Sequence, residues 1–297
     1  MQNLFEQLKS ISGLELRENE PLSRHTGFRT GGCCTMLLIK EEAALVSAVN
    51  MLRSAAVPYF VLGRGSNVLA MDEGYDGVVV KYVNDTMEAE GSTITAHAGA
   101  PLSAVCLKAL AHNLSGLEFA YGIPASVGGA VFMNAGAYGG EIADVLVSVR
   151  VLDEQGNIVT MLAKELSLSY RHSIFHTRRG CVIVSAEFKL TEGDATAISA
   201  AMDDVMARRM EKQPLELPSC GSTFKRPEGA FAAKLIDDCG LRGVSVGGAQ
   251  VSEKHCGFVV NKGGATTADI LKLCGQIKDT VKSKTGYELE MEVQLLK

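Results

Sequence analysis

The 297-residue sequence predicts a mixed α/β or α+β fold, because helix-type and strand-type apolar patterns alternate along most of the chain. Residues 41–56 place their apolar side chains on one helical face: Leu45, Ala48, Val49 and Leu52. Short apolar strands are predicted at 59–62 and 77–83, which makes this region a small β–α–β unit. Near the other end of the chain, residues 288–296 alternate between apolar and polar side chains, as a strand with one buried face does.

Further elements are predicted between these regions. A strand at 93–98 precedes a helix at 101–112, and strands follow near 145–152, 157–162 and 181–190. The composition changes at 192–194, and a helix over 195–213 then ends before Pro214. Gly286 is placed to end a last helix at 267–284, whose apolar stripe is Ile270, Cys274, Ile277 and Val281.

Composition and charge narrow the class of protein. Hydrophobic residues make up 46% and charged residues 21%, as in an ordinary globular protein. The net charge is −5 and no Lys/Arg run exceeds two, which argues against a nucleic-acid or anionic-membrane surface. Glu6 interrupts the start where a signal peptide needs an apolar core, and no apolar run reaches the roughly 18 residues of a membrane span. We therefore expect a cytoplasmic protein without membrane insertion, whose oligomeric state the sequence leaves open.

The eight cysteines predict free thiols rather than disulfides or a metal centre. They form no CxxC pair, and the six histidines form no HxH or HxxxH arrangement. In a cytoplasmic chain of this length most of these thiols are expected to be buried. Cys220 lies two residues before Ser222, so an effect of its thiol on that serine stays open.

Residues 116–141, GLEFAYGIPASVGGAVFMNAGAYGGE, are the most informative segment. Seven glycines and five alanines are mixed with large apolar residues, unlike the composition of a flexible linker. Glycine at this density predicts turns with positive φ or a backbone that lies against a partner. Because N–H groups freed by such turns can hold a pyrophosphate, we expect a wall around a large, flat, phosphate-bearing cofactor. The alternative is a tightly packed loop–helix junction without a ligand.

The turn at 63–67, Gly-Arg-Gly-Ser-Asn, is a second candidate for phosphate binding. It follows the strand at 59–62 and offers serine and asparagine hydrogen-bonding groups. It is neither a Walker A loop nor a GxGxxG fingerprint. Alone it is indistinguishable from an ordinary turn, but together with 116–141 it favours a dinucleotide held in a non-Rossmann flavin site.

Seven motifs recur in an order that resembles one known family. They are PLSRHTGFRTGG (21–32), LGRGSNVL (62–69), the 116–141 segment, YRHSIF (170–175), GSTFKRP (221–227), GGAQVSEKHCGFVVN (247–261) and LEMEVQLL (289–296). Across about residues 21–296 they resemble the UDP-N-acetylenolpyruvoylglucosamine reductase family of bacterial cell-wall precursor synthesis. The chain has no long insertion after YRHSIF, which matches the shorter subtype that lacks a tyrosine-bearing loop.

Three positions depart from the family's usual residues: Ala125, Ala233 and Gln294. None of these changes removes a chemically required group. Ala125 stands where a glycine is usual, which costs some backbone freedom. The effect of Ala125 and Ala233 on flavin affinity stays open.

The resemblance implies a fold and a division into parts. It implies an FAD-binding part of the PCMH/vanillyl-alcohol-oxidase type with two α+β subdomains, followed by a C-terminal α+β substrate-binding domain. The expected parts are an N-terminal segment 1–25, an FAD part 26–193 and a substrate domain 194–297. The FAD part divides at about 83/84, into subdomains 26–83 and 84–193, and the last strand, 287–297, carries a catalytic glutamate.

The resemblance also implies three catalytic residues. Ser222 matches the family's proton donor, Arg171 the group that grips the substrate carboxylate, and Glu292 its partner in stabilising the intermediate. A serine hydroxyl is a weak acid, but a carbanion is a base strong enough to take its proton. The planar arginine fork suits a carboxylate. From the residues alone, each could instead be a turn serine, a surface arginine or a carboxylate on a solvated sheet face.

The remaining site residues follow from the glycine-rich segments and the resemblance together. We expect contacts to FAD from Gly63, Arg64, Gly65, Ser66, Asn67, Gly122, Ile123, Pro124, Gly128, Gly129, Asn134, Gly136 and Ala137. Contacts to the UDP-sugar substrate are expected from Tyr170, Arg209, Lys212 and Lys225. No metal is expected.

The implied reaction is the NADPH-dependent reduction of UDP-N-acetyl-3-O-(1-carboxyvinyl)-glucosamine to UDP-N-acetylmuramate. In the family, NADPH reduces FAD and leaves, FADH2 delivers a hydride from N5 to the enolpyruvyl β-carbon, and the residue matching Ser222 supplies the proton. One alternative is a PCMH-type FAD-dependent alcohol oxidase, which needs neither NADPH nor these three catalytic residues. Another is a non-catalytic flavin- or nucleotide-binding module. NADPH and the sugar nucleotide are implied by the resemblance alone.

Overall fold

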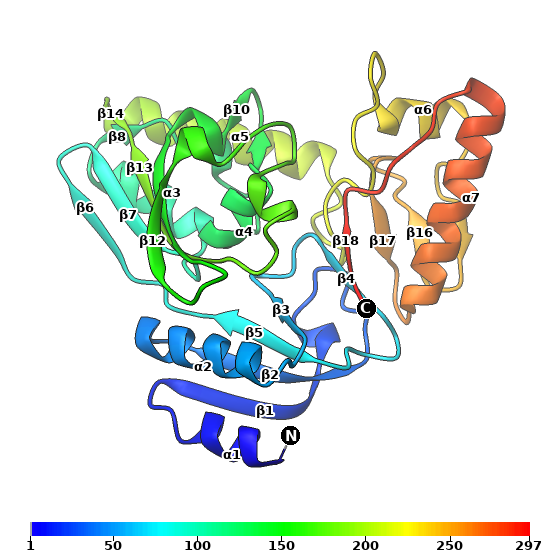
Figure 1. The fold of residues 1–297 in the computed structure, drawn as a ribbon. Helices are drawn as coiled ribbons and strands as arrows, with labels where there is room; N and C mark the ends of the chain where they lie inside the picture. The colour runs from blue at the N-terminus through cyan, green and yellow to red at the C-terminus, as the bar shows by residue number, and fades with distance from the viewer. Residues whose placement is uncertain (1) are drawn as a thin grey trace. The chain divides into compact units, whose positions relative to one another are not determined.

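A computed structural model describes residues 2–297, which form two compact units. Unit 1 comprises Met1–Glu18, Thr35–Arg64 and Gly77–Ala207, and unit 2 comprises Asn19–Cys34, Gly65–Asp76 and Arg208–Lys297. Figure 1 shows the course of the chain through both units. Their boundaries differ from the predicted parts, because two short N-terminal stretches pack with the C-terminal residues. The functional roles predicted for the parts stay predictions.

The first sheet of unit 1 contains the predicted β–α–β unit. Its strand order is β1-β2-β5-β3, and β2 and β3 each pair with β5 in parallel. Helix α2 connects β2 to β3 (Figure 1). It buries the apolar face that its sequence predicts. The elements are α1 Gln2–Lys9, β1 Leu14–Pro21, β2 Cys33–Ile39, α2 Glu42–Ser54, β3 Tyr59–Val61 and β5 Val78–Tyr82.

The second sheet of unit 1 is antiparallel, in the order β12-β11-β13-β7-β6, and α4 packs on β7 and β13. Four of its strands confirm predicted ones. The sheet and its helices are β6 Met87–Glu90, β7 Thr93–His97, α3 Leu102–Ala111, α4 Val127–Phe132, β11 Leu146–Leu152, β12 Ile158–Leu162 and β13 Val182–Lys189. Short pairs add β8 Leu114–Ser115 with β14 Thr191–Glu192, and β9 Gly136–Ala137 with β10 Gly140–Glu141. The 3-10 turns are Leu22–Arg24 in unit 2 and, in unit 1, Glu118–Ala120, Ile142–Asp144, Ala163–Glu165 and Ile174–His176.

Unit 2 contains a small antiparallel sheet covered by a long helix. Its strand order is β15-β16-β17, and α7 packs on β15 and β16. Helix α7 begins with a Thr266–Asp269 capping box and ends at Gly286 with φ +78, as predicted for a helix-ending glycine. The elements are β4 Val68–Ala70, α6 Ala232–Asp238, β15 Ser245–Val246, β16 Ala249–Val251, β17 Val259–Asn261, α7 Thr267–Thr285 and β18 Gln294–Leu296. Helix α5, Ala195–Lys212, continues from unit 1 into unit 2 and ends before Pro214, as predicted.

The predicted closing strand is wrong over most of its length. Only Gln294–Leu296 forms a strand, which pairs in parallel with β4. Leu289 and Val293 are buried as the alternation predicts, but Leu295 is 39% exposed. The strand pattern fails because the chain changes partner: residues 290–292 lie against 223–225, and 294–296 pair with β4.

All eight cysteines are free thiols, and seven of them are buried, which confirms the prediction that most of them are buried. Among residues 2–297, no helix is long and apolar enough to cross a membrane.

Candidate active site

The two glycine-rich segments meet within unit 1. Helix α4 begins after Ser126, whose Oγ accepts a hydrogen bond from Gly129 N at 3.3 Å. A Cβ added to Gly63 would lie 2.5 Å from that Oγ, so the turn after β3 lies directly against the first turn of α4. A larger residue at position 63 would therefore displace the Ser126 hydroxyl that caps α4, which favours glycine there. Sequence reasoning missed Ser126, although a serine just before an apolar helix is a recognisable N-cap signal.

The N–H groups at the start of α4 already have partners within the protein. Gly128 N donates to Ala98 O at 2.9 Å, and Gly129 N donates to Ser126. A Cβ on Gly128 would lie 2.9 Å from the Ala98 Cβ, so this glycine also permits α4 to pack closely. The predicted contacts of Gly128 and Gly129 to the cofactor stay predictions, beside this packing role.

The turn after β3 holds a run of unpaired N–H groups. Within residues 2–297, the N–H groups of Gly63, Arg64, Gly65 and Ser66 donate no hydrogen bond to another protein group. Gly65 has φ +66 and is buried. Buried N–H groups are rarely left without a partner, and successive N–H groups around a left-handed residue form anion-binding nests. This turn therefore has the chemistry of a phosphate-binding element.

The segment after residue 121 supplies further backbone of the same kind. Gly122 has φ +90, and within the described chain its N–H donates to no protein group. Pro124 is exposed and Ile123 is half-buried, whereas Ala137 pairs with Gly140 in the β9–β10 hairpin.

The backbone at Ala125 does not have a positive φ. Alanine therefore fits at 125 without the strain that a left-handed position would impose.

Gly65 and Cys220 are both held in the interior of unit 2. A Cβ on Gly65 would lie 1.9 Å from His25 O, so only glycine fits. Cys220 Sγ donates to Val68 O at 3.3 Å, and burial raises the pKa of this thiol to about 12. Cys220 is therefore a protonated structural thiol with no thiolate to offer Ser222.

Unit 2 brings Ser222 and Glu292 onto adjacent backbone segments. Glu292 N donates to Thr223 O at 2.9 Å. Phe224 and Met291 form an antiparallel bridge next to this bond. Two residues that are 70 positions apart in the sequence thus lie at neighbouring positions of one short antiparallel pair.

The surroundings of these two side chains differ. Ser222 is exposed and follows Gly221, which has φ +72. Glu292 is only 9% exposed, unlike its neighbours Glu288 and Glu290, which are exposed. Glu292 is therefore not a carboxylate on a solvated sheet face, which favours a specific role for it.

The backbone next to Ser222 is held by hydrogen bonds of the neighbouring residue, Thr223. Thr223 is fully buried, its N donates to Gly257 O at 2.8 Å, and its Oγ1 accepts from Val259 N at 3.0 Å. His255 Nδ1 accepts from Gly257 N at 3.1 Å, and burial lowers the pKa of this histidine. A neutral imidazole can accept that bond, so the loop that supports Thr223 is itself hydrogen-bonded.

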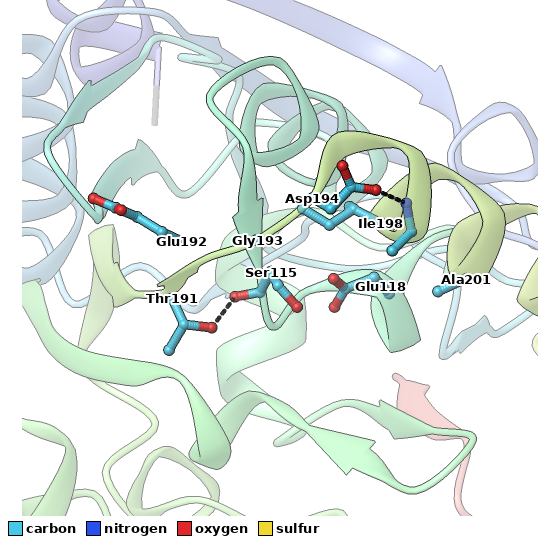
Figure 2. Close-up of a pocket in the computed structure, with 9 residues that line it drawn as sticks. Ser115, Glu118, Thr191, Glu192, Gly193, Asp194, Ile198 and Ala201 are labelled. Atoms are coloured by element: carbon cyan, nitrogen blue, oxygen red, sulfur yellow. Dashed lines mark hydrogen bonds between the residues drawn. The ribbon is translucent and has the colours of Figure 1, made fainter.

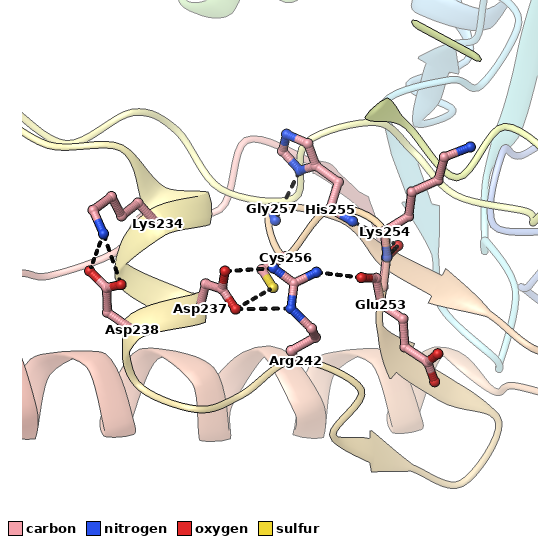
Figure 3. Close-up of polar contacts among 10 residues, drawn as sticks. Lys234, Asp237, Asp238, Arg242, Glu253, Lys254, His255, Cys256 and Gly257 are labelled. Carbon is pink, nitrogen blue, oxygen red and sulfur yellow. Dashed lines mark hydrogen bonds and ion pairs between the residues drawn. The ribbon is translucent and has the colours of Figure 1, made fainter. Parts of the chain in front are cut away.

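An ion pair anchors the same loop (Figure 3). Arg242 Nε donates to Asp237 Oδ1 at 3.0 Å, and its Nη1 donates to Glu253 O. Cys256 Sγ donates to the same Asp237 oxygen at 3.4 Å. Burial and then Asp237 raise the pKa of Cys256 to about 11, so this thiol stays protonated and structural.

Arg171 occupies a two-residue hairpin turn of unit 1. Ser169 and His172 exchange backbone hydrogen bonds at 3.1 and 3.0 Å. Arg171 between them has φ +53, and its Nη2 donates to Gly136 O at 2.9 Å. Its guanidinium carbon lies 5.3 Å from the centre of the Tyr170 ring. The structure therefore places the predicted carboxylate-binding residue directly on the glycine-rich segment.

The predicted substrate contacts come from both units, Tyr170 from unit 1 and the other three from unit 2. Tyr170 is 48% exposed beside Arg171, and Lys225 Nζ pairs with Glu290 at 2.6 Å in unit 2. Near the end of α5, Arg209 is buried and Lys212 is exposed. Their contacts to a substrate stay predictions.

A cavity of about 420 Å³ in unit 1 contains none of the predicted site residues (Figure 2). It is lined by Ser115, Glu118, Thr191, Glu192, Gly193, Asp194, Ala197, Ile198 and Ala201. Glu118 accepts from Gly116 N and Asp194 from Ala197 N, both at 2.8 Å. Glu118 and Asp194 thus bind local backbone groups, and the acidic lining does not suit a phosphate-bearing ligand.

Comparisons with known proteins match most of the chain. A family model for the C-terminal domain of UDP-N-acetylenolpyruvoylglucosamine reductase matches residues 213–296, and an FAD binding domain model matches residues 36–162. The UDP-N-acetylenolpyruvoylglucosamine reductase of Clostridium perfringens (strain SM101) is 49% identical over 284 residues, which cover 95% of this chain and 93% of that protein. The chain belongs to the UDP-N-acetylenolpyruvoylglucosamine reductase family.

Other relatives agree with this assignment. The reductase of Agathobacter rectalis is 48% identical over 302 residues, covering 97% of this chain and 96% of that protein. The crystal structure of the Thermus caldophilus UDP-N-acetylenolpyruvylglucosamine reductase has a TM-score of 0.84 and 34% identity, covering 96% of this chain and all of that one. The predicted family, the FAD-binding fold and the assignment as an FAD-containing oxidoreductase of peptidoglycan precursor synthesis are confirmed.

Proposed function

We propose that this chain reduces UDP-N-acetyl-3-O-(1-carboxyvinyl)-glucosamine to UDP-N-acetylmuramate with electrons from NADPH. The observation that carries this proposal is that hydrogen bonds hold the segments of all three candidate catalytic residues in place. Arg171 is fixed on the glycine-rich segment of unit 1, and Ser222 and Glu292 share one backbone pair in unit 2. Because NADPH and UDP-sugars are cytoplasmic metabolites, we also propose that the reaction takes place in the cytoplasm.

The residues of the 63–66 turn and of the α4 region fit a bound FAD. The unpaired N–H groups of Gly63, Arg64 and Ser66 suit the diphosphate, and the glycine at 63 allows close approach to α4. When bound, FAD supplies the relay of a hydride from NADPH to the β-carbon of the enolpyruvyl group.

Ser222 supplies the proton in this proposal. Addition of hydride to the β-carbon turns the CH2 group into a methyl group and leaves an electron pair on the α-carbon, beside the carboxylate. The exposed hydroxyl of Ser222 donates its proton there, which completes the saturated lactyl ether. A serine is acidic enough for this step only because the carbanion is a strong base.

Arg171 and Glu292 stabilise the charge that develops on the substrate. The guanidinium fork of Arg171 suits the substrate carboxylate, onto which the α-carbon electron pair is delocalised. Its hydrogen bond to Gly136 O fixes the direction of the fork. Glu292 is a largely buried group next to the Ser222 segment, where we propose that it partners Arg171 in stabilising the intermediate.

An anaerobic absorbance experiment tests the proposal. The purified FAD-loaded protein should be yellow, lose its colour with NADPH and regain it when UDP-N-acetyl-3-O-(1-carboxyvinyl)-glucosamine is added. Colour that returns only with oxygen, after reduction by an alcohol, would identify an oxidase instead. A protein whose spectrum does not change when FAD is added would contradict the flavin assignment.

A further inference from the structure

Asn134 lies in the glycine-rich segment and has no exposed surface. Its side chain and backbone are 0% exposed, and its φ of +41 is in the left-handed region. From the sequence we predicted a contact between Asn134 and the cofactor. A residue without accessible surface has nothing to offer a ligand, which favours a different role.

Both ends of the Asn134 amide are engaged inside unit 1. Oδ1 accepts from Ala143 N at 2.9 Å, and Nδ2 donates to Ser169 O at 3.1 Å. Ser169 is the first residue of the hairpin turn that carries Arg171. The amide thus connects two backbone segments, and only a side chain with both an acceptor and a donor can do so.

Two other bonds connect the same segments. Ser173, which is fully buried, donates from Oγ to Phe132 O at 2.7 Å. Arg171 Nη2 donates to Gly136 O at 2.9 Å. Three hydrogen bonds therefore attach the hairpin to residues 132–136, one each at Ser169, Arg171 and Ser173.

We propose that Asn134 and Ser173 are positioning residues that hold the Arg171 hairpin in its left-handed turn. This inference rests on the proposed function, because it assumes that Arg171 binds the substrate carboxylate. Arg171 itself has φ +53, which a non-glycine residue adopts only when its surroundings hold it there. The Asn134 and Ser173 bonds supply that support on both sides of the turn.

The test compares Asn134→Asp, Ser173→Ala and Arg171→Ala in the FAD-loaded protein. Aspartate tolerates a positive φ and keeps the acceptor for Ala143, but it cannot donate to Ser169. The matched control is Asn113→Asp, which makes the same chemical change at an exposed asparagine with φ +56. For each variant, NADPH-driven bleaching and recovery of colour with the enolpyruvyl sugar nucleotide are timed separately.

We expect Asn134→Asp to retain FAD and bleach at the wild-type rate, but to recover colour about 10–100-fold more slowly, the scale of a small misplacement. Ser173→Ala should show the same pattern more weakly, and Asn113→Asp should match the wild type. Adding Asn134→Asp to Arg171→Ala should slow recovery by less than about 2-fold further, because both act through one group. Hydrogen exchange in residues 165–173 should rise in Asn134→Asp before any substrate is added.

Different results separate the two proposals. If Arg171→Ala recovers colour at the wild-type rate, both the role of Arg171 and this inference are wrong. If Arg171→Ala is slow while Asn134→Asp and Ser173→Ala are normal, only this inference is wrong. Loss of FAD from Asn134→Asp, or equal slowing of both half-reactions, would return Asn134 to the cofactor site. If Asn134→Asp does not fold, a wild-type recovery rate in Ser173→Ala overturns the inference.

Discussion

Asn67 donates a hydrogen bond from Nδ2 to the backbone oxygen of Glu292 at 3.2 Å. Gln294 N donates to Asn67 O at 2.9 Å, two residues further along the same segment. The turn that carries the predicted phosphate-binding groups is thus connected within unit 2 to the segment that carries a predicted catalytic carboxylate. The predicted phosphate-binding turn and the backbone of Glu292 are therefore held by the same few hydrogen bonds.

This connection predicts the effect of Asn67→Ala. The substitution removes one of the two side-chain donors to the Glu292 carbonyl, the other being Gln294 Nε2 at 3.4 Å. The free energy of unfolding should therefore fall by about 0.5–1.5 kcal/mol, the net contribution of one ordinary hydrogen bond. Thermal unfolding of the FAD-free protein measures this loss. Asn157→Ala is the control, since Asn157 is exposed and its side chain makes no hydrogen bond among the described residues. Equal unfolding temperatures for the two variants would contradict the prediction.

Ser222→Ala should separate the two half-reactions. Reduction of FAD by NADPH requires no proton from Ser222, so bleaching should keep its rate. Recovery of colour with the enolpyruvyl substrate should slow by about 10²–10⁴-fold, the usual effect of losing a general acid. Stopped-flow absorbance under anaerobic conditions measures both steps. Ser245→Ala is the control, because Ser245 is exposed and its hydroxyl bonds only to Gly243 O nearby. Equal slowing of both steps in Ser222→Ala would count against the proton-donor role.

The sequence predicted the bounds of the helices more accurately than it predicted which strands pair. Helices α2, α3, α5 and α7 agree with prediction to within about two residues, because their apolar spacing is a local property. The pairing of β18 with β4 joins residues more than 200 positions apart, and no local pattern records it. The alternation in 288–296 therefore indicated an extended segment but not its change of partner.

For the candidate site too, local features could be predicted from the sequence, whereas contacts between distant residues could not. The resemblance predicted catalytic roles for Arg171, Ser222 and Glu292, which stay predictions, and the glycine content indicated where the backbone lies in close contact. The sequence could not show that the N–H groups of α4 are occupied or that Asn134 is buried, because both depend on tertiary packing.

Gly65→Ala should be far more destabilising than an ordinary glycine substitution in a turn. The added Cβ would lie 1.9 Å from His25 O, at a residue with φ +66. Gly91→Ala is the matched control, since Gly91 has φ +55 and nothing lies within 4 Å of its added Cβ. Left-handed strain alone costs about 1–2 kcal/mol, so Gly91→Ala should fold with a modestly lower unfolding temperature. Gly65→Ala should lose several kcal/mol or fail to accumulate as folded protein. Similar unfolding temperatures for the two variants would show that the backbone at Gly65 can move away.

The cysteines give a prediction that needs no cofactor. Cys33 is the one exposed thiol among the eight. Burial raises the pKa of most of the others to about 11 or 12: Cys34, Cys106, Cys181, Cys220, Cys256 and Cys274. A thiol reagent attacks the thiolate, and a raised pKa moves thiolate formation to higher pH, so these buried groups stay unreactive as the pH rises from about 7 to 9.

The native protein should therefore bind about one equivalent of a thiol reagent at pH 8, and Cys33→Ser should bind none, because Cys33 is the one exposed thiol of the eight. Mass spectrometry of the labelled protein counts the groups and identifies the position. In denaturant all eight thiols should react, which confirms that no disulfide protects them. Rapid labelling of Cys220 in the native protein would contradict its burial and reopen an influence of that thiol on Ser222, two residues away.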